Sequence, residues 1–282
     1  GYVLVRNPVC REVVHRIDLG RGNVDGIIFI TKDPGPMIPH LEEIVSMGHK
    51  CMFQITLNPY GRDMEPGVRF KADVAESFRA ISRIMGKERV TWRYDPVIFN
   101  DTHGIDYHRR KFEMLCRELE GFTTQCTFSF VDIYGKLGKH TSSGTIREVT
   151  DTEKDAFGMM AGEVAPRYGI RPNHCCPDRD LSRFGIDRRG CIDAETMRML
   201  GIPYEEIQTP LRRVCSCVKN IDIGTYDTCM HDCIYCYANK STPGRRHSTV
   251  YDPRGEMLCD SLSDADRVVE LKSRDVSRLS DF

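Results

Sequence analysis

Residues 25–31 read Asp-Gly-Ile-Ile-Phe-Ile-Thr, a nearly continuous apolar run that leads into the turn sequence Lys32-Asp33-Pro34. A short apolar run of this kind is typical of a strand buried on both faces of a parallel sheet. Other short runs, rich in β-branched and aromatic residues, predict further strands. The predicted strands are residues 2–6, 26–31, 51–57, 90–94 and 125–133, with a sixth ending at residues 174–176.

Helical patterns fill the intervals between these strands. Residues 71–85 and 105–119 each repeat apolar side chains at the spacing of an amphipathic helix. Shorter or weaker patterns predict helices at residues 37–47, 150–168 and 194–200. Strands that alternate with helices indicate a parallel sheet of β/α units. We therefore expect an α/β protein with a parallel β/α barrel, complete or partial and similar to a TIM barrel.

The composition excludes several classes of protein. The chain has 282 residues, a formal net charge of −1 and 40% hydrophobic residues, as in an ordinary globular protein. No apolar run approaches the roughly 20 residues of a membrane helix, and no secretory signal stands at the start. We expect a cytoplasmic protein with no membrane partner. The near-neutral charge also argues against a nucleic acid as partner.

The 13 cysteines are the most unusual feature, and eight of them lie between Cys175 and Cys236. In a long chain without a secretory signal, such a cluster indicates metal binding rather than disulfides. Strand and helix patterns also become sparse from residue 175 onward. We therefore expect a barrel core at residues 1–174, a cysteine-rich iron–sulfur segment completing the barrel at residues 175–259, and a C-terminal tail or short helix at residues 260–282.

Residues 229–236 read Cys-Met-His-Asp-Cys-Ile-Tyr-Cys, so that Cys229, Cys233 and Cys236 are spaced Cys-x3-Cys-x2-Cys. Three thiolates on one tight loop can hold three corners of a [4Fe-4S] cluster and leave the fourth iron open. An electron-transfer cluster would usually have four cysteine ligands. A zinc site is the alternative, because His231 lies inside the loop and other cysteines lie nearby.

This motif resembles the signature of the radical S-adenosylmethionine superfamily, including the aromatic Tyr235 before the third cysteine. Residues 224–239 are especially similar to the branch that contains spore photoproduct lyase. The resemblance implies that S-adenosylmethionine binds the open iron, that an electron cleaves it to a 5′-deoxyadenosyl radical, and that the Tyr235 backbone contacts the adenine. It also implies a reductant such as flavodoxin or ferredoxin as partner.

The position of the motif departs from that superfamily, in which it follows the first barrel strand near the N-terminus. Here it begins at residue 229 of 282. A circularly permuted barrel would reconcile the two, with residues 221–224 as the strand that delivers the motif. The chain also resembles the uncharacterised DUF1848 family, in residues 2–8, 53–61 and 92–96 and in its C-terminal cysteines. That resemblance supports a cluster but implies no substrate.

A second group of cysteines precedes the motif and could hold a second, fully ligated cluster. Its role would be electron relay or substrate anchoring. A structural zinc with four thiolates and plain reduced cysteines are the alternatives. The members of this group are Cys175, Cys176, Cys191, Cys215 and Cys217.

Polar residues at the ends of the predicted strands are candidates for the chemistry. Arg93 and Asp95 lie two residues apart and therefore share a face of an extended strand. Arg93 could bind a carboxylate of substrate or cofactor with two hydrogen bonds, or form a buried pair with Asp95 that only organises the barrel. The same reasoning selects Gln54, Thr56 and Asn58 as cofactor contacts and Asp132 as a further catalytic residue.

The sequence thus predicts a radical S-adenosylmethionine enzyme acting on a small-molecule or otherwise unknown substrate. The alternative is a non-catalytic metal-binding or electron-transfer protein that holds zinc or an iron–sulfur cluster. Nucleic-acid repair is a third hypothesis, which rests only on the likeness to spore photoproduct lyase and would require a basic, aromatic groove.

Overall fold

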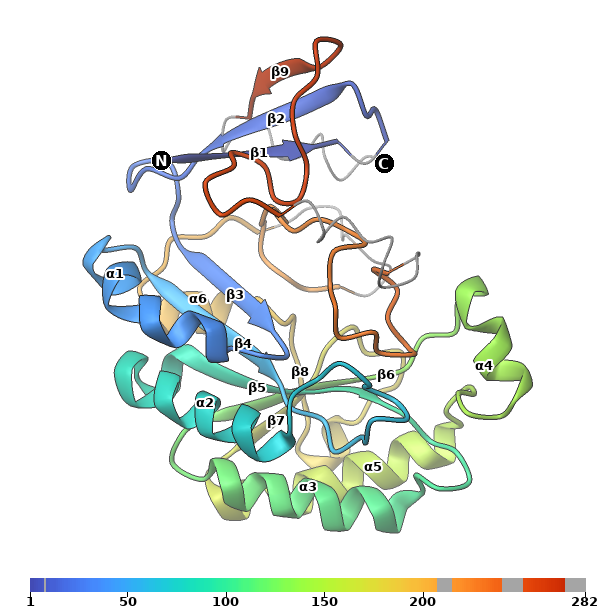
Figure 1. Ribbon diagram of the computed structural model, residues 1–282. Coiled ribbons are helices and arrows are strands. Elements are labelled where there is room, and N and C mark those ends of the chain that lie inside the picture. Colours follow the sequence, from blue (N-terminus) through green and yellow to red (C-terminus); the bar gives the residue numbers. More distant parts are fainter. Residues whose placement is uncertain (8, 207–214, 240–250, 272–282) are drawn as a thin grey trace.

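The computed structural model describes residues 1–7, 9–206, 215–239 and 251–271 (Figure 1). Its main element is a six-stranded sheet in which every pairing is parallel and the strand order follows the sequence. Each strand is therefore hydrogen-bonded to the next one along the chain. The six strands are β3 (Ile27–Thr31), β4 (Cys51–Thr56), β5 (Val90–Val97), β6 (Gln125–Phe130), β7 (Arg171–His174) and β8 (Asp187–Arg188).

Helices connect these strands and bury one face of the sheet. The core on this face contains Phe53 and Ile55 of β4, Phe78 of α2 and Phe112 of α3. Figure 1 shows α2, α3 and α5 side by side beneath the sheet. The helices are α1 (Leu41–Ser46), α2 (Lys71–Met85), α3 (Ile105–Leu119), α4 (Gly138–Ser142), α5 (Asp151–Val164) and α6 (Ala194–Met199), with short 3-10 turns η1 (Gly35–His40), η2 (Lys87–Arg89), η3 (Gly135–Leu137), η4 (Ala165–Tyr168) and η5 (Ser182–Phe184).

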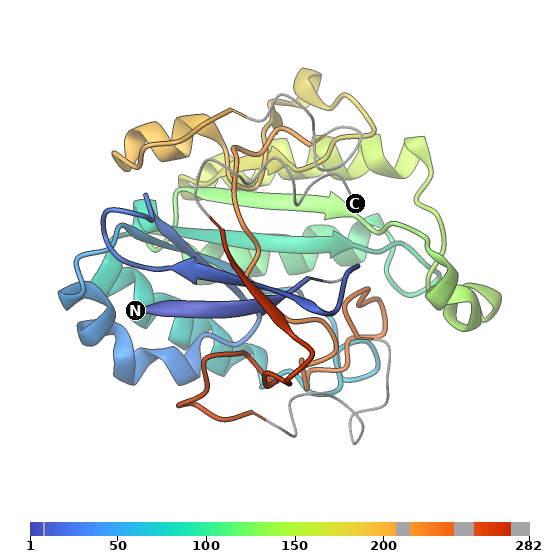
Figure 2. The ribbon, with the colours of Figure 1, turned by 90° about the horizontal axis from the view of Figure 1, so that it is seen from above.

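The cysteine-rich segment and a small second sheet cover the opposite face. The second sheet consists of β1 (Tyr2–Arg6), β2 (Val13–Asp18) and β9 (Arg267–Glu270). Seen from above, the second sheet lies over part of the main sheet, with β9 running obliquely across it, as Figure 2 shows. Closer to β4, Met52 packs with Met197 of α6 and with Cys217 and Val218. No helix among the described residues is long and apolar enough to cross a membrane.

The expected barrel, complete or partial, is not confirmed in its complete form, because the main sheet is open. Strands β3 and β8 are the two edges of the main sheet, and within the described part of the chain no pairing joins them. Strand β8 has only two residues and pairs with β7 alone among the described strands. Residues 221–224, expected to deliver the cysteine motif as a strand of a permuted barrel, form no strand.

Two predicted strands have different surroundings from those expected. Strand β3 pairs only with β4, so it is an edge strand, and Ile30 is 54% exposed rather than buried on both faces. Strand β1 pairs antiparallel with the unpredicted β2 and lies outside the parallel sheet. A parallel crossover needs about a dozen residues or more, and the connection from Arg6 to Val13 is too short for one.

The C-terminal segment also differs from the prediction. Residues 267–270 form β9, parallel to β2, where a tail or short helix was expected.

Candidate functional site

The cysteine loop, residues 229–236, lies against the segment that follows β4. The Gly67 N–H donates to the His231 carbonyl at 2.8 Å, and the Ile234 N–H donates to the Met64 carbonyl at 3.0 Å. A Cβ on Gly67 would lie 2.4 Å from the Met230 carbonyl oxygen and 2.8 Å from the His231 Cα. Only glycine permits this approach. The loop is therefore held at the edge of the sheet where the parallel strands end.

The three thiols of the loop range from buried to exposed. Cys233 is buried, Cys236 is half-buried and Cys229 is exposed. Electrostatic interactions join Cys233 to both others, and burial raises the pKa of Cys233 to about 12 although Lys32 opposes this shift. Asp232 has φ 55°, a left-handed conformation that turns the chain sharply next to Cys233. This donor set fits a cluster bound by three thiolates with one side open.

A buried hydrogen-bond network surrounds Tyr235. Its hydroxyl donates to the Glu65 carboxylate and accepts a 3.2 Å bond from the Asn58 side-chain amide. Glu65 also binds the ammonium groups of Lys32, at 3.0 Å, and Lys71. Burial raises the pKa of Glu65, but the two lysines outweigh burial and the pKa is lowered overall. The network therefore carries two ammonium groups for one carboxylate directly beside the cysteine loop.

The backbone of Tyr235 is also held in place. The Tyr134 hydroxyl donates to the Tyr235 carbonyl oxygen at 2.6 Å. A carbonyl oxygen has two lone pairs, so it retains one acceptor position. Tyr134 lies between β6 and η3, which means that two different strand ends, those of β4 and β6, position the same tyrosine.

The second group of cysteines also comes together. The sulfur atoms of Cys191 and Cys217 lie 3.5 Å apart, and those of Cys175 and Cys176 lie 3.9 Å apart. Cys175 also interacts with Cys191, and Cys217 interacts electrostatically with Cys215. Four of these thiols, Cys175, Cys176, Cys191 and Cys217, are therefore in contact, Cys215 lies near them, and none of the 13 cysteines forms a disulfide.

Arg93 lies beside this second group. Its guanidinium binds Asp95 and donates to the Gln54 side chain at 3.1 Å, and it interacts electrostatically with Cys191 and Cys175. Burial opposes its charge, but these partners outweigh burial and raise the pKa of Arg93. Gln54 donates in turn to the Cys191 carbonyl. Gln54 of β4 and Arg93 of β5 thus contact the cysteine-rich segment.

Asn58 connects the two groups of cysteines. Its side-chain amide donates to the Asp95 carbonyl at 2.8 Å, its side-chain oxygen accepts from the Asp95 N–H at 2.8 Å, and the same amide reaches Tyr235. Asp95 binds Arg93, which lies beside Cys191. A short series of hydrogen bonds and ion pairs therefore leads from one group of thiols to the other.

Two predicted site residues lie outside these networks. Thr56 is half-buried and is linked to Arg93 only as its register partner in the sheet. Asp132 is exposed beyond the end of β6. Among the residues that the structure describes, no three histidine, cysteine or acidic side chains are placed to hold a single metal ion.

Sequence reasoning missed Glu65, Lys71, Tyr134 and Ser129, whose hydroxyl donates to Asp95. Glu65 and Lys71 lie in or just after an irregular stretch without periodicity. The only sequence feature that indicated Glu65 and Lys71 was their position after a predicted strand, because ligands bind at the carboxyl ends of the strands in parallel sheets.

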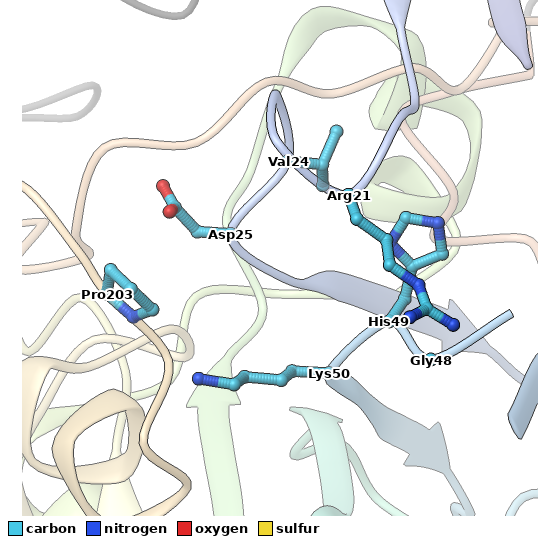
Figure 3. Close-up of a pocket in the computed structure, with 7 residues that line it drawn as sticks. All are labelled: Arg21, Val24, Asp25, Gly48, His49, Lys50 and Pro203. Carbon is cyan, nitrogen blue, oxygen red and sulfur yellow. The ribbon is translucent and has the colours of Figure 1, made fainter.

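A surface hollow of about 170 Å³ lies away from the thiols. It is located where β3 and β4 begin, at the opposite edge of the sheet from the cysteine loop. Figure 3 shows Lys50 extended toward Pro203, and Arg21 beside Gly48 and His49. The remaining lining residues are Val24 and Asp25.

Comparison with family models gives a match over most of the chain. A family model described as "Domain of unknown function (DUF1848)" matches residues 1–238, which include both groups of cysteines. No curated protein and no solved structure matches the chain.

Proposed function

The chain belongs to the DUF1848 family, and from that premise we propose that it is a radical S-adenosylmethionine enzyme. In this proposal Cys229, Cys233 and Cys236 hold a [4Fe-4S] cluster whose fourth iron binds S-adenosylmethionine. When bound, the cluster supplies the electron that cleaves the sulfonium group, with a flavodoxin- or ferredoxin-type protein as reductant. The substrate is a small or otherwise unidentified molecule.

One observation carries the proposal: three thiols at radical-enzyme spacing lie on a loop that Gly67 and Met64 hold at the C-terminal edge of a parallel sheet. Each thiolate of a cubane binds a different iron, so the three sulfur atoms need not converge on one point. In open α/β sheets, ligands bind outside the carboxyl ends of the strands. The open sheet, with its strands in sequence order, supports a partial rather than a complete barrel.

The residues around the loop have separate tasks in this proposal. Lys32 acts against burial and lowers the pKa of Cys233, and the ammonium groups of Lys32 and Lys71 favour the carboxylate of a bound ligand. Tyr134 fixes the Tyr235 backbone, which contacts the adenine and has an acceptor position left for it. Arg93 and Asp95 bind each other and act as positioning residues.

The test is S-adenosylmethionine cleavage by anaerobically reconstituted protein with dithionite as reductant. We expect 5′-deoxyadenosine from the wild-type protein and none from Cys233→Ser. Cys116→Ala is the matched control, because Cys116 is a buried thiol on the apolar face of α3, away from both groups. A wild-type protein that contains iron and sulfide but forms no 5′-deoxyadenosine would support the non-catalytic alternative, an electron-transfer protein.

A further inference from the structure

We propose that Cys175, Cys191, Cys215 and Cys217 hold a second iron–sulfur cluster, fully ligated by cysteine. This centre is distinct from the loop at residues 229–236 and does not depend on S-adenosylmethionine. It would lie on the face of the main sheet opposite α2, α3 and α5.

The backbone is shaped to bring these thiols together. Cys175 directly follows β7, and Cys176 has φ 49°, a left-handed conformation. Along an extended strand neighbouring side chains point to opposite faces. Here the left-handed residue brings the Cys176 sulfur to 3.9 Å from that of Cys175, so both thiols lie on the side of the cysteine-rich segment.

Gly190 permits the closest approach in the group. A Cβ on Gly190 would lie 2.6 Å from the Cys217 nitrogen and 2.7 Å from the Ser216 carbonyl oxygen. The backbone before Cys191 therefore lies directly on the backbone before Cys217, which places their sulfur atoms 3.5 Å apart. The Val218 N–H, which donates to the Ile192 carbonyl at 2.8 Å, fixes the same two segments just beyond the cysteines.

The sheet beneath the thiols contains buried polar atoms that have no partner. The Arg93 Nε and the Asn173 side-chain oxygen are buried, and within the described residues neither is hydrogen-bonded. Both residues are in register with Thr127, on opposite sides of β6, so they share one face of the sheet. Buried groups of this kind usually indicate an ion or a water molecule that completes their hydrogen bonding.

The charge and the donors suit a cluster that carries thiolates and sulfides. Arg93 is positively charged, interacts with Cys191 and Cys175, and offers its Nε–H as a donor. Hydrogen bonds to the sulfur atoms are among the groups that stabilise and tune such clusters. Four cysteines complete a [4Fe-4S] cluster. In this proposal Cys175 is a ligand and the neighbouring Cys176 is not.

Iron, sulfide and zinc per chain, measured on anaerobically purified full-length protein, test this proposal. The key variant replaces all three loop cysteines, Cys229, Cys233 and Cys236, by serine. We expect it to retain about four irons with an equal amount of sulfide, whether or not the loop cluster cleaves S-adenosylmethionine. Adding Cys191→Ser and Cys217→Ser to this variant should remove the remaining iron.

Gly190→Ala provides a second test that changes no ligand. It should lower the iron of the triple variant, whereas Gly22→Ala, a glycine with open space around it, should leave it unchanged. Far-ultraviolet circular dichroism verifies that each variant is folded. A folded triple variant without iron and sulfide would overturn the proposal, and so would zinc in place of iron that disappears with Cys191→Ser and Cys217→Ser.

Discussion

At the scale of single residues, two glycines control how closely the cysteine segments approach the rest of the chain. Gly67 faces the loop at residues 229–236, and Gly190 faces residues 216–217. At both positions two backbone segments are in contact, and a Cβ atom on the glycine would separate them. Elsewhere the chain has glycines with nothing nearby, such as Gly22, which provide matched controls.

The first prediction concerns Gly67→Ala. The added methyl group must displace the Met230 carbonyl, since the two would otherwise lie 2.4 Å apart. We expect the loop to move away from the sheet, with loss of about four irons per chain and of S-adenosylmethionine cleavage. Iron analysis beside Gly22→Ala measures the effect. Full iron and full activity in Gly67→Ala would show that the close approach is not needed.

The second prediction concerns His108, which is fully buried. Its Nε2–H donates to the Ile98 carbonyl at 3.0 Å, and in the neutral ring Nδ1 accepts a 2.8 Å bond from the Tyr94 hydroxyl. Burial lowers the pKa of His108 to about 4. Because this pKa lies below that of an unfolded histidine, its contribution to stability is full above about pH 6.5 and falls as the pH decreases toward about 4.

Denaturant unfolding measures this contribution. When the pH falls from about 7.5 to about 5, we expect the free energy of unfolding of the wild-type protein to decrease by on the order of 2 kcal/mol because of His108. His108→Gln keeps a polar side chain but does not titrate, so its stability should fall less over the same interval. Equal slopes for the two proteins would mean that His108 does not control this part of the pH dependence.

At this scale the spacing of the cysteines was readable from the sequence, because the loop motif is local. Glu65, in contrast, was not predicted. It becomes significant only because the fold brings it to Tyr235, 170 residues away along the chain. Contacts between distant segments leave no periodic signal in the sequence.

At the scale of secondary structure, the prediction was most accurate where an amphipathic pattern was long. Helices α2 and α3 have the predicted bounds, since each buries one apolar face against the sheet. The short, polar β2 and β9 were missed, because their pairing depends on β1 and on each other rather than on local pattern. Burial on both faces was wrongly predicted for β3, since an apolar run does not reveal which strand lies at the edge.

The third prediction belongs to α5. Thr150 and Glu153 form a capping box at its first turn. Thr150→Ala removes the acceptor for the Glu153 N–H, and we expect a loss of about 1 kcal/mol in the free energy of unfolding. The midpoint of denaturant unfolding should fall while the m-value stays unchanged. Thr152→Ala, an exposed threonine in the same turn, is the control, and an equal shift in both variants would contradict the cap.

At the scale of the whole molecule, the main sheet separates two environments. One face is apolar and covered by α2, α3 and α5, whereas the other carries Gln54, Arg93 and Asn173 beneath the cysteine-rich segment. The α/β class and the parallel β/α units were predictable from alternating patterns. The sequence left open whether the barrel is complete or partial, because closure depends on pairing between the two edge strands, and no local pattern reveals that pairing.

The central claim is that the loop at residues 229–236 holds a cluster with one open iron. The most direct measurement is the electron paramagnetic resonance spectrum of the reduced, anaerobically reconstituted protein, recorded with and without S-adenosylmethionine. We predict that S-adenosylmethionine changes the spectrum of the wild-type cluster and that this change is absent in Cys233→Ser. A reducible cluster whose spectrum S-adenosylmethionine leaves unchanged, or a protein that holds zinc and no sulfide, would contradict the claim.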